Sequence, residues 1–145
     1  MFKSFLSFQF LLYFLIFALN VQASITDIPT IKACFNESCF ILDHAYTHEQ
    51  KKKGLMFVTN LPEHKGMLFS WNKETFISMW MKHTYIPLDM IWIDDDYSIV
   101  HLHQQATPLD LTPIRSPLKA KYVIELNAGT IKQKGIQLND KVNFY

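Results

Sequence analysis

The segment from Lys82 to Asp89 holds the residues best suited to chemistry. Lys82, His83 and Thr84 follow an apolar pair, and Asp89 interrupts an apolar stretch. A carboxylate in such a stretch must be paired or hydrogen-bonded, because it is otherwise costly to bury. Two interpretations of Asp89 remain open. In the structural one, it accepts hydrogen bonds from Thr84 or main-chain N–H groups and holds the bend at residues 85–87. In the functional one, it is a base or ligand anchor at a pocket mouth, and Lys82 supplies charge.

A second acidic residue also lies between apolar neighbours. Glu125 is the third residue of the sequence Val-Ile-Glu-Leu, and Lys82, Lys53 and Arg115 are its candidate partners in an ion pair. Such a pair would serve either as structural support or as the polar floor of a site. We therefore predict a ligand-binding site, with Met81 nearby, that comprises Lys82, His83, Thr84, Asp89 and Glu125.

Methionines are concentrated between residues 56 and 90, and this suggests a different chemistry. They are Met56, Met67, Met79, Met81 and Met90, and His64 and His83 lie near them in the sequence. Thioether and imidazole ligands favour Cu(I), so a copper-handling protein is the first alternative function. The competing explanation is that flexible methionines fill gaps in a core rich in aromatic residues, and the chain has no Met-x-x-Met cluster.

A histidine pair offers a weaker indication of metal binding. His101 and His103 lie two residues apart on an expected strand, so both should project from the same face as Ile99. A zinc site would need a third ligand, which a strand pair alone does not supply. We therefore expect exposed strand histidines and no metal or other cofactor.

The chain shows no standard catalytic motif. It has no Gly-x-Ser-x-Gly, no phosphate-binding glycine-rich loop, no His-Glu-x-x-His and no dinucleotide fingerprint. We expect a non-catalytic ligand- or partner-binding accessory module. A small hydrolase or lyase with Asp89 as its base is the second alternative, and it requires another polar group within hydrogen-bonding reach.

Several short blocks together resemble one protein family. They are Gly54-Leu55-Met56, Gly66-Met67-Leu68-Phe69, Trp80-Met81-Lys82-His83-Thr84, Ile86-Pro87-Leu88-Asp89, Val123-Ile124-Glu125-Leu126 and Gly129. At these spacings they resemble the domain of unknown function 192 family, also called uncharacterised protein family 0127. The resemblance covers roughly residues 31–144 and implies a compact, β-rich, barrel-like domain without a settled activity. His83 stands where the family block has Asn, which argues against an Asn-dependent mechanism.

The pattern of the chain predicts an α+β fold that is mainly antiparallel β. Thr47 and Gln50 form a capping box for a short helix that Gly54 ends, and Gly66 and Gly129 are also expected at turns or helix ends. Strands are expected at residues 76–81, 88–93, 99–103, 122–126 and 142–144, a surface loop at 104–118 and a possible short helix at 129–134. These elements favour a compact barrel-like sheet with one or two short helices.

The first residues have the pattern of a secretory signal peptide. Lys3 precedes an almost wholly apolar stretch at residues 5–19, and small residues before Ser24 offer a cleavage site. We predict a signal peptide at residues 1–23, one domain at residues 24–145, and a periplasmic or extracellular location; a retained N-terminal anchor is the alternative. In an exported chain, Cys34 and Cys39 should form a disulfide across a hairpin; a redox pair or a metal site is less expected.

The overall charge is close to neutral. The formal net charge is +1, and it becomes zero once Lys3 is removed. Nucleic acids and anionic membranes select basic surfaces, so we expect neither as a main partner after signal removal. The expected partner is a small ligand or a protein, and the sequence identifies neither that partner nor an oligomeric state.

Overall fold

The computed structural model describes residues 28–145, so the predicted signal peptide at residues 1–23 lies outside the described residues. Its elements are β1 (Thr30–Phe35), β2 (Ser38–Ala45), α2 (His48–Lys53), β3 (Lys65–Thr75), β4 (Ser78–Met79), β5 (Leu88–Ile93), β6 (Ile99–Ala106), β7 (Ile114–Arg115), β8 (Ala120–Asn127), α3 (Thr130–Lys134) and β9 (Val142–Phe144). Neither described helix is long and apolar enough to cross a bilayer.

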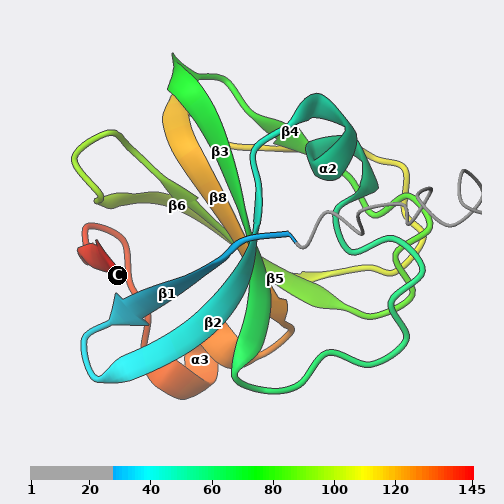
Figure 1. Cartoon of the computed structure of the whole chain (residues 1–145), viewed down its shortest axis with the longest axis horizontal. Helices are drawn as coiled ribbons and strands as arrows, with labels where there is room; N and C mark the ends of the chain where they lie inside the picture. The colour runs from blue at the N-terminus through cyan, green and yellow to red at the C-terminus, as the bar shows by residue number, and fades with distance from the viewer. Residues whose placement is uncertain (1–27) are drawn as a thin grey trace, which may run out of the picture.

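Most described strands form one curled sheet (Figure 1), in the order β6-β5-β8-β3-β2-β1-β9. Strands β4 and β7 form a separate two-stranded sheet. All pairings of the curled sheet are antiparallel except that of β2 with β3. The expected α+β, mainly antiparallel fold with short helices is therefore confirmed.

The parallel pairing of β2 with β3 requires a crossover connection between them. Residues 46–64 make this connection and contain α2. The expected capping box is present: the N–H of Gln50 donates to the Thr47 hydroxyl, and the Gln50 side chain accepts from the N–H of Thr47. Gly54 ends α2 with a φ of +47°.

Two hairpins form as expected from the sequence. In the first, Cys34 of β1 pairs directly with Cys39 of β2, and a disulfide joins them. In the second, β5 and β6 pair across an acidic turn, where the Asp94 carboxylate accepts from the N–H of Ser98 at 2.8 Å. A disulfide is compatible with an oxidising compartment.

The central strand β3 was not predicted. Residues 66–69 are buried on both faces, so they lack the alternation that identifies a half-buried strand. The expectation that Gly66 marks a turn or helix end is wrong, because Gly66 lies within β3. A Cβ atom there would approach the carbonyl oxygen of Glu125 to 2.5 Å, so close packing explains this glycine.

The expected strand at residues 76–81 is mostly irregular. Only Ser78 and Met79 are in strand conformation, and they pair with β7, which lies within the expected loop at residues 104–118. The expected alternation nevertheless holds in the burial: Phe76 and Trp80 are exposed, whereas Ile77, Met79 and Met81 are buried.

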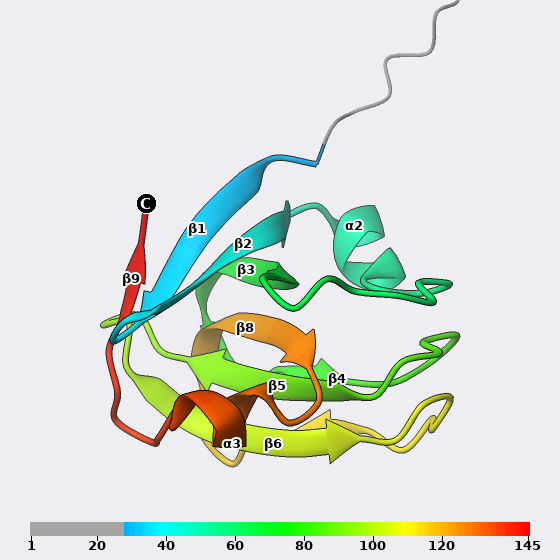
Figure 2. The ribbon, with the colours of Figure 1, turned by 90° about the horizontal axis from the view of Figure 1, so that it is seen from below.

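Two apolar clusters pack on the opposite faces of the sheet. Because successive strand residues point to opposite faces, Ile124 and Leu126 of β8 contribute to one cluster and Val123 to the other. We call them the α3-side cluster, which includes Ile131 of α3, and the methionine cluster, which includes Met67, Met79, Met81 and Met90. In Figure 2, α3 lies against the end of the sheet near β5 and β6, while α2 lies beyond β2 and β3.

The two edge strands of the sheet, β6 and β9, approach each other. Strand β9 pairs with β1, and the N–H of Val142 donates to the carbonyl oxygen of Tyr97 just before β6 at 2.9 Å. Ser98 also forms an isolated bridge with Lys141. These contacts curl the sheet into the expected barrel-like shape.

The histidine pair does not share a face with Ile99, so that expectation is wrong. A register shift between the pairs Trp92–His101 and Ile93–Ile99 inserts one extra residue into β6. Ile99 consequently packs in the α3-side cluster, while the His101 ring lies 5.1 Å from the Trp92 ring of the methionine cluster. Burial, followed by the charge of His103, lowers the pKa of His101.

Candidate functional site

Glu125 is an ionisable residue in the middle of the methionine cluster. It lies on β8, where its cross-strand neighbours are Met67 of β3 and Met90 of β5. Only 4% of Glu125 is exposed, and burial raises the pKa of its carboxyl group to about 8. The carboxyl group is therefore mainly protonated at neutral pH, and it can donate a hydrogen bond as well as accept one.

A small cavity lies next to Glu125, and we call it the Glu125 cavity. Its volume is about 20 Å³, enough for one water molecule. Its lining includes Glu125, Thr84, Lys82, Phe69, Met79 and Trp80, together with residues 51–56 from the end of α2 and the loop after it. Three of the predicted site residues, Lys82, Thr84 and Glu125, thus line one cavity.

Four lysines give this cavity a positive surround. Lys51, Lys52 and Lys53 come from the last turn of α2, and Lys82 comes from the loop before β5. The ammonium group of Lys82 lies 5.2 Å from the ring centre of Trp80, in a cation–π arrangement. Among residues 28–145, the one ion pair joins Lys121 to Asp95, so these lysines have no acidic partner there.

Lys51 is held more firmly than its neighbours. Its ammonium group donates to the carbonyl oxygen of Ser70 at 2.9 Å and lies 4.9 Å from the ring centre of Trp71. Partial burial lowers the pKa of Lys51. The expected pairing of Glu125 with Lys82, Lys53 or Arg115 does not form an ion pair in the described part of the chain.

The backbone of residues 80–87 sets the position of Lys82 and Thr84. The N–H of Thr84 donates to the carbonyl oxygen of Met81 at 3.1 Å, which closes a tight turn around His83. His83 has a φ of +54°, and the Thr84 hydroxyl donates to the carbonyl oxygen of Lys82 at 3.3 Å. Thr84 is buried by this turn, while Lys82 remains partly exposed.

Asp89 lies on the opposite face of the sheet from Glu125. It is fully buried, and its two oxygens accept from the N–H of Gln105 at 2.9 Å and from the N–H of Ile131 at 2.8 Å. It therefore fastens an irregular point of β6, where Gln105 has a φ of +55°, to the first turn of α3. This geometry fits the structural interpretation of Asp89, in which main-chain N–H groups donate to its carboxylate. Thr84 is not one of these donors.

His83 does not line the Glu125 cavity. Its ring stacks on that of Phe57, with the ring centres 5.3 Å apart and the planes at 17°. The structure thus brings together three of the five predicted residues and separates Asp89 and His83 from them. The lysines of α2 were not predicted as site residues, although their position directly before the Gly54-Leu55-Met56 block was a usable signal.

The methionines pack as core residues. Met67, Met79, Met81 and Met90 are buried together with Phe69 and Trp92, whereas Met56 lies outside this cluster. Within residues 28–145, no group of three His, Cys, Asp or Glu side chains lies close enough together to hold a metal ion.

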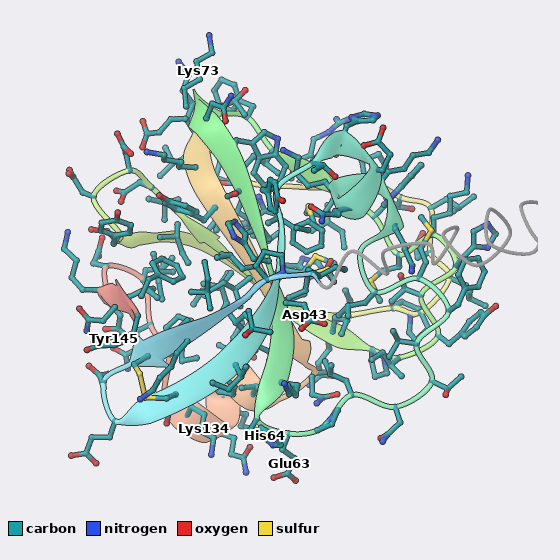
Figure 3. All side chains as sticks on the ribbon, in the orientation of Figure 1. Asp43, Glu63, His64, Lys73, Lys134 and Tyr145 are labelled. Carbon is teal, nitrogen blue, oxygen red and sulfur yellow. A yellow bond between two sulfur atoms is a disulfide. The ribbon has the colours of Figure 1, made fainter. Side chains whose placement is uncertain are left out.

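A larger cleft of about 580 Å³ lies elsewhere, between the start of β2 and α3. Figure 3 shows Glu63, His64 and Lys134 at this edge of the molecule. None of the predicted site residues lines it. A cleft of about 710 Å³ beside residues 53–58 is larger still. Size alone favours either cleft, but the Glu125 cavity has a buried carboxyl group with a strongly shifted pKa, which is the better indication of function.

Comparisons with known proteins agree on one family. The profile of the DUF192 family, described as an uncharacterised ACR, matches residues 31–144. A crystal structure of a candidate transcription regulator from Sinorhizobium meliloti 1021 superposes with a TM-score of 0.75 at 32% identity, covering 79% of this chain and 92% of that one. A protein of unknown function from Novosphingobium aromaticivorans DSM 12444 gives a TM-score of 0.71 at 31% identity, covering 79% and 83%. No curated protein matches the chain.

Proposed function

The chain belongs to the uncharacterised DUF192 family, and we propose that it is an exported, non-catalytic binding module whose site is the Glu125 cavity. The observation that carries this proposal is the convergence of Lys82, Thr84 and Glu125 on one cavity. Two separate segments of the chain supply these polar groups, although apolar residues surround them. The disulfide between Cys34 and Cys39 supports the exported location.

The size of the cavity limits what it accepts. Sites that enclose a whole small molecule typically have volumes of about 300–1,000 Å³, whereas this cavity has about 20 Å³. Only a terminal group can enter, and the rest of the ligand or partner must remain outside, near the exposed ring of Trp80.

The charges favour an anionic terminal group, such as a carboxylate. Lys51, Lys52, Lys53 and Lys82 attract it, and the protonated carboxyl group of Glu125 donates a hydrogen bond to it. Ionisation of Glu125 above pH 8 would replace this hydrogen bond with repulsion. Binding should therefore weaken as the pH rises through about 8.

A thermal-shift and calorimetric screen against small carboxylates, sugars and peptidoglycan fragments tests this function. A ligand at a hundred times its Kd adds about 2.7 kcal/mol of stability, which raises the Tm by several degrees. A carboxylate hit should disappear in Lys82→Ala and persist in Glu125→Gln, and only the wild type should lose binding above pH 8.

Lys119→Ala is the matched control for this screen. Lys119 also lies over an aromatic ring, that of Phe76, but it is outside the cavity. Equal losses of ligand binding in Lys82→Ala and Lys119→Ala would show that the binding depends on general surface charge and not on the cavity. No anionic hit, or a hit that Lys82→Ala leaves unchanged, would contradict the proposal.

An ester hydrolase is the second candidate function. The geometry that favours it does not involve Asp89. The Ser70 hydroxyl lies 2.8 Å from Nε2 of His44, and burial, followed by the charge of Lys51, lowers the pKa of His44 and keeps it neutral as a base. Labelling by a fluorophosphonate that disappears in Ser70→Ala would support this candidate. Asp89, the base of the hydrolase alternative from the sequence, has no exposed surface.

A further inference from the structure

Three loops meet at one end of the molecule, and we call their combined surface the three-loop face. They are residues 54–62 after α2, residues 80–87 before β5 and residues 107–113 after β6. Figure 2 shows them projecting in the same direction, on the right of the view. Main-chain hydrogen bonds join them: the N–H of Phe57 donates to the carbonyl oxygen of His83 at 2.8 Å, and that of Leu109 donates to the carbonyl oxygen of Thr84 at 3.1 Å.

Each loop contains one non-glycine residue in the left-handed backbone region. Phe57, His83 and Leu109 have φ values of +67°, +54° and +64°. Large side chains rarely adopt this conformation, and such strain persists only where the surroundings impose it. The hydrogen bonds between the loops impose it here.

The strained backbone holds large apolar side chains in solvent. Phe57 is 58% exposed, Leu109 is 55% exposed, and Tyr85 and Leu111 are also exposed. The Phe57 ring contacts His83 face to face and Tyr85 edge to face, so these rings form one cluster. An exposed cluster of this kind marks an interaction surface.

Basic residues border this apolar cluster. Lys51, Lys52 and Lys53 immediately precede the first loop, and Lys82 lies in the second beside the exposed Trp80. Asp110, in the third loop, is the one carboxylate within the loop segments. Asp43 and Glu49 line the cleft beside Phe57, so the four lysines exceed the three nearby carboxylates by one and the local charge is weakly positive.

We propose that the three-loop face docks on a bilayer surface that carries anionic headgroups, with Phe57, Leu109 and Leu111 inserted into the interface. Apolar side chains with a lysine border and amphipathic Tyr and Trp rings are the composition that binds at this depth. Lysines near an anionic bilayer surface are attracted to its headgroups. The sequence-based expectation of no membrane partner rested on the total charge, which conceals this local arrangement.

The test is co-sedimentation with vesicles of phosphatidylcholine alone or with added phosphatidylglycerol. The protein is purified in the form in which the cell produces it. We expect binding to the anionic vesicles only, and weaker binding at high salt. The variant Phe57→Asn with Leu109→Asn should bind about tenfold less. Asparagine tolerates a positive φ, so these changes preserve the backbone conformation.

Leu138→Asn is the matched control, because Leu138 is equally exposed but lies between α3 and β9. It should bind like the wild type, and vesicle binding should shift the fluorescence of the wild type but not of Trp80→Phe. No binding to either vesicle, or an equal loss in Leu138→Asn, would overturn the proposal. If the loop variant still binds vesicles but no longer binds a protein that co-purifies with the wild type, the membrane proposal would be overturned in favour of a protein partner. The Phe57 and Leu109 changes leave the Glu125 cavity intact, so ligand-induced thermal shifts test the proposed function separately.

Discussion

The buried carboxyl group of Glu125 makes the stability of this domain depend on pH. Its pKa in the folded protein is about 8, compared with an ordinary value of 4.5. The folded state therefore holds this proton more tightly than the unfolded state does. The stabilising contribution is complete below about pH 4.5 and is lost as the pH rises through about 8.

Glu125→Gln should remove this dependence while keeping a similar shape. Relative to the variant, the wild type should lose up to roughly 5 kcal/mol of unfolding free energy between pH 4.5 and 9, measured by urea denaturation. The difference between the two proteins cancels the contributions of other groups. Parallel pH profiles would show that Glu125 is ionised without penalty in the folded state.

Asp89→Ala should destabilise the domain strongly. It leaves the N–H groups of Gln105 and Ile131 without their acceptor in a buried place, and hydrogen bonds to a charged group contribute about 1.5–3 kcal/mol each. We expect a loss of about 4 kcal/mol in chemical denaturation. Asp96→Ala, an exposed change in the β5–β6 turn, should cost little, and a similar small cost for Asp89→Ala would contradict its fastening role.

The sequence identifies Glu125 and Asp89 for the same reason, because both interrupt apolar strands. It cannot assign them to opposite faces, since that depends on the register between β5 and β8. Asp89 pairs with Leu126, so the two acidic residues are close along the sheet while their side chains point apart. Only the three-dimensional pairing separates the structural carboxylate from the candidate site.

At the scale of elements, β3 connects the parallel and antiparallel parts of the sheet. Gly66 lets it approach its neighbours, because a Cβ atom there would lie 2.5 Å from the Glu125 carbonyl oxygen and 2.8 Å from Leu42 Cδ2. The first of these atoms belongs to the backbone of β8 and cannot move without disturbing the strand.

Gly66→Ala should therefore destabilise the protein by about 3 kcal/mol or more, through forced displacement of packed strands. Gly135→Ala is a useful comparison, because that position has no close atoms but a φ of +64°. It should cost about 1 kcal/mol from backbone conformation alone. Equal melting temperatures for the two variants would contradict the packing explanation for Gly66.

Local elements are easier to predict from this sequence than distant pairings. The capping box of α2 and the β5–β6 hairpin depend on residues close together in the chain, and both form as expected. Strand β3 was missed because its buried residues do not alternate. The pairing of β4 with β7 was missed because their contacts join residues far apart in the sequence.

At the scale of the whole molecule, β9 completes the curl of the sheet. It covers the outer edge of β1, and Val142 is buried in the α3-side cluster. Removal of residues 142–145 should cost about 4 kcal/mol from lost apolar burial and hydrogen bonds. The exposed edge of β1 should also promote association between molecules.

Urea denaturation and light scattering check this prediction. Tyr145→Ala is the control, because the main chain of Tyr145 bonds to Lys32 while its side chain is exposed. That variant should remain monodisperse and nearly as stable as the wild type. A truncated protein that behaves like it would show that β9 contributes little.

The parallel pairing of β2 with β3 also has a consequence for how this domain can diversify. The crossover it requires carries α2, its three lysines and the Phe57 loop as one contiguous piece, residues 46–64. Glu125, in contrast, is set by the register of the sheet. If the Glu125 cavity binds a ligand as proposed, exchange of this single piece between homologous genes would change the ligand preference and leave the rest of the sheet unchanged. The same piece is a natural cassette for engineering new specificity.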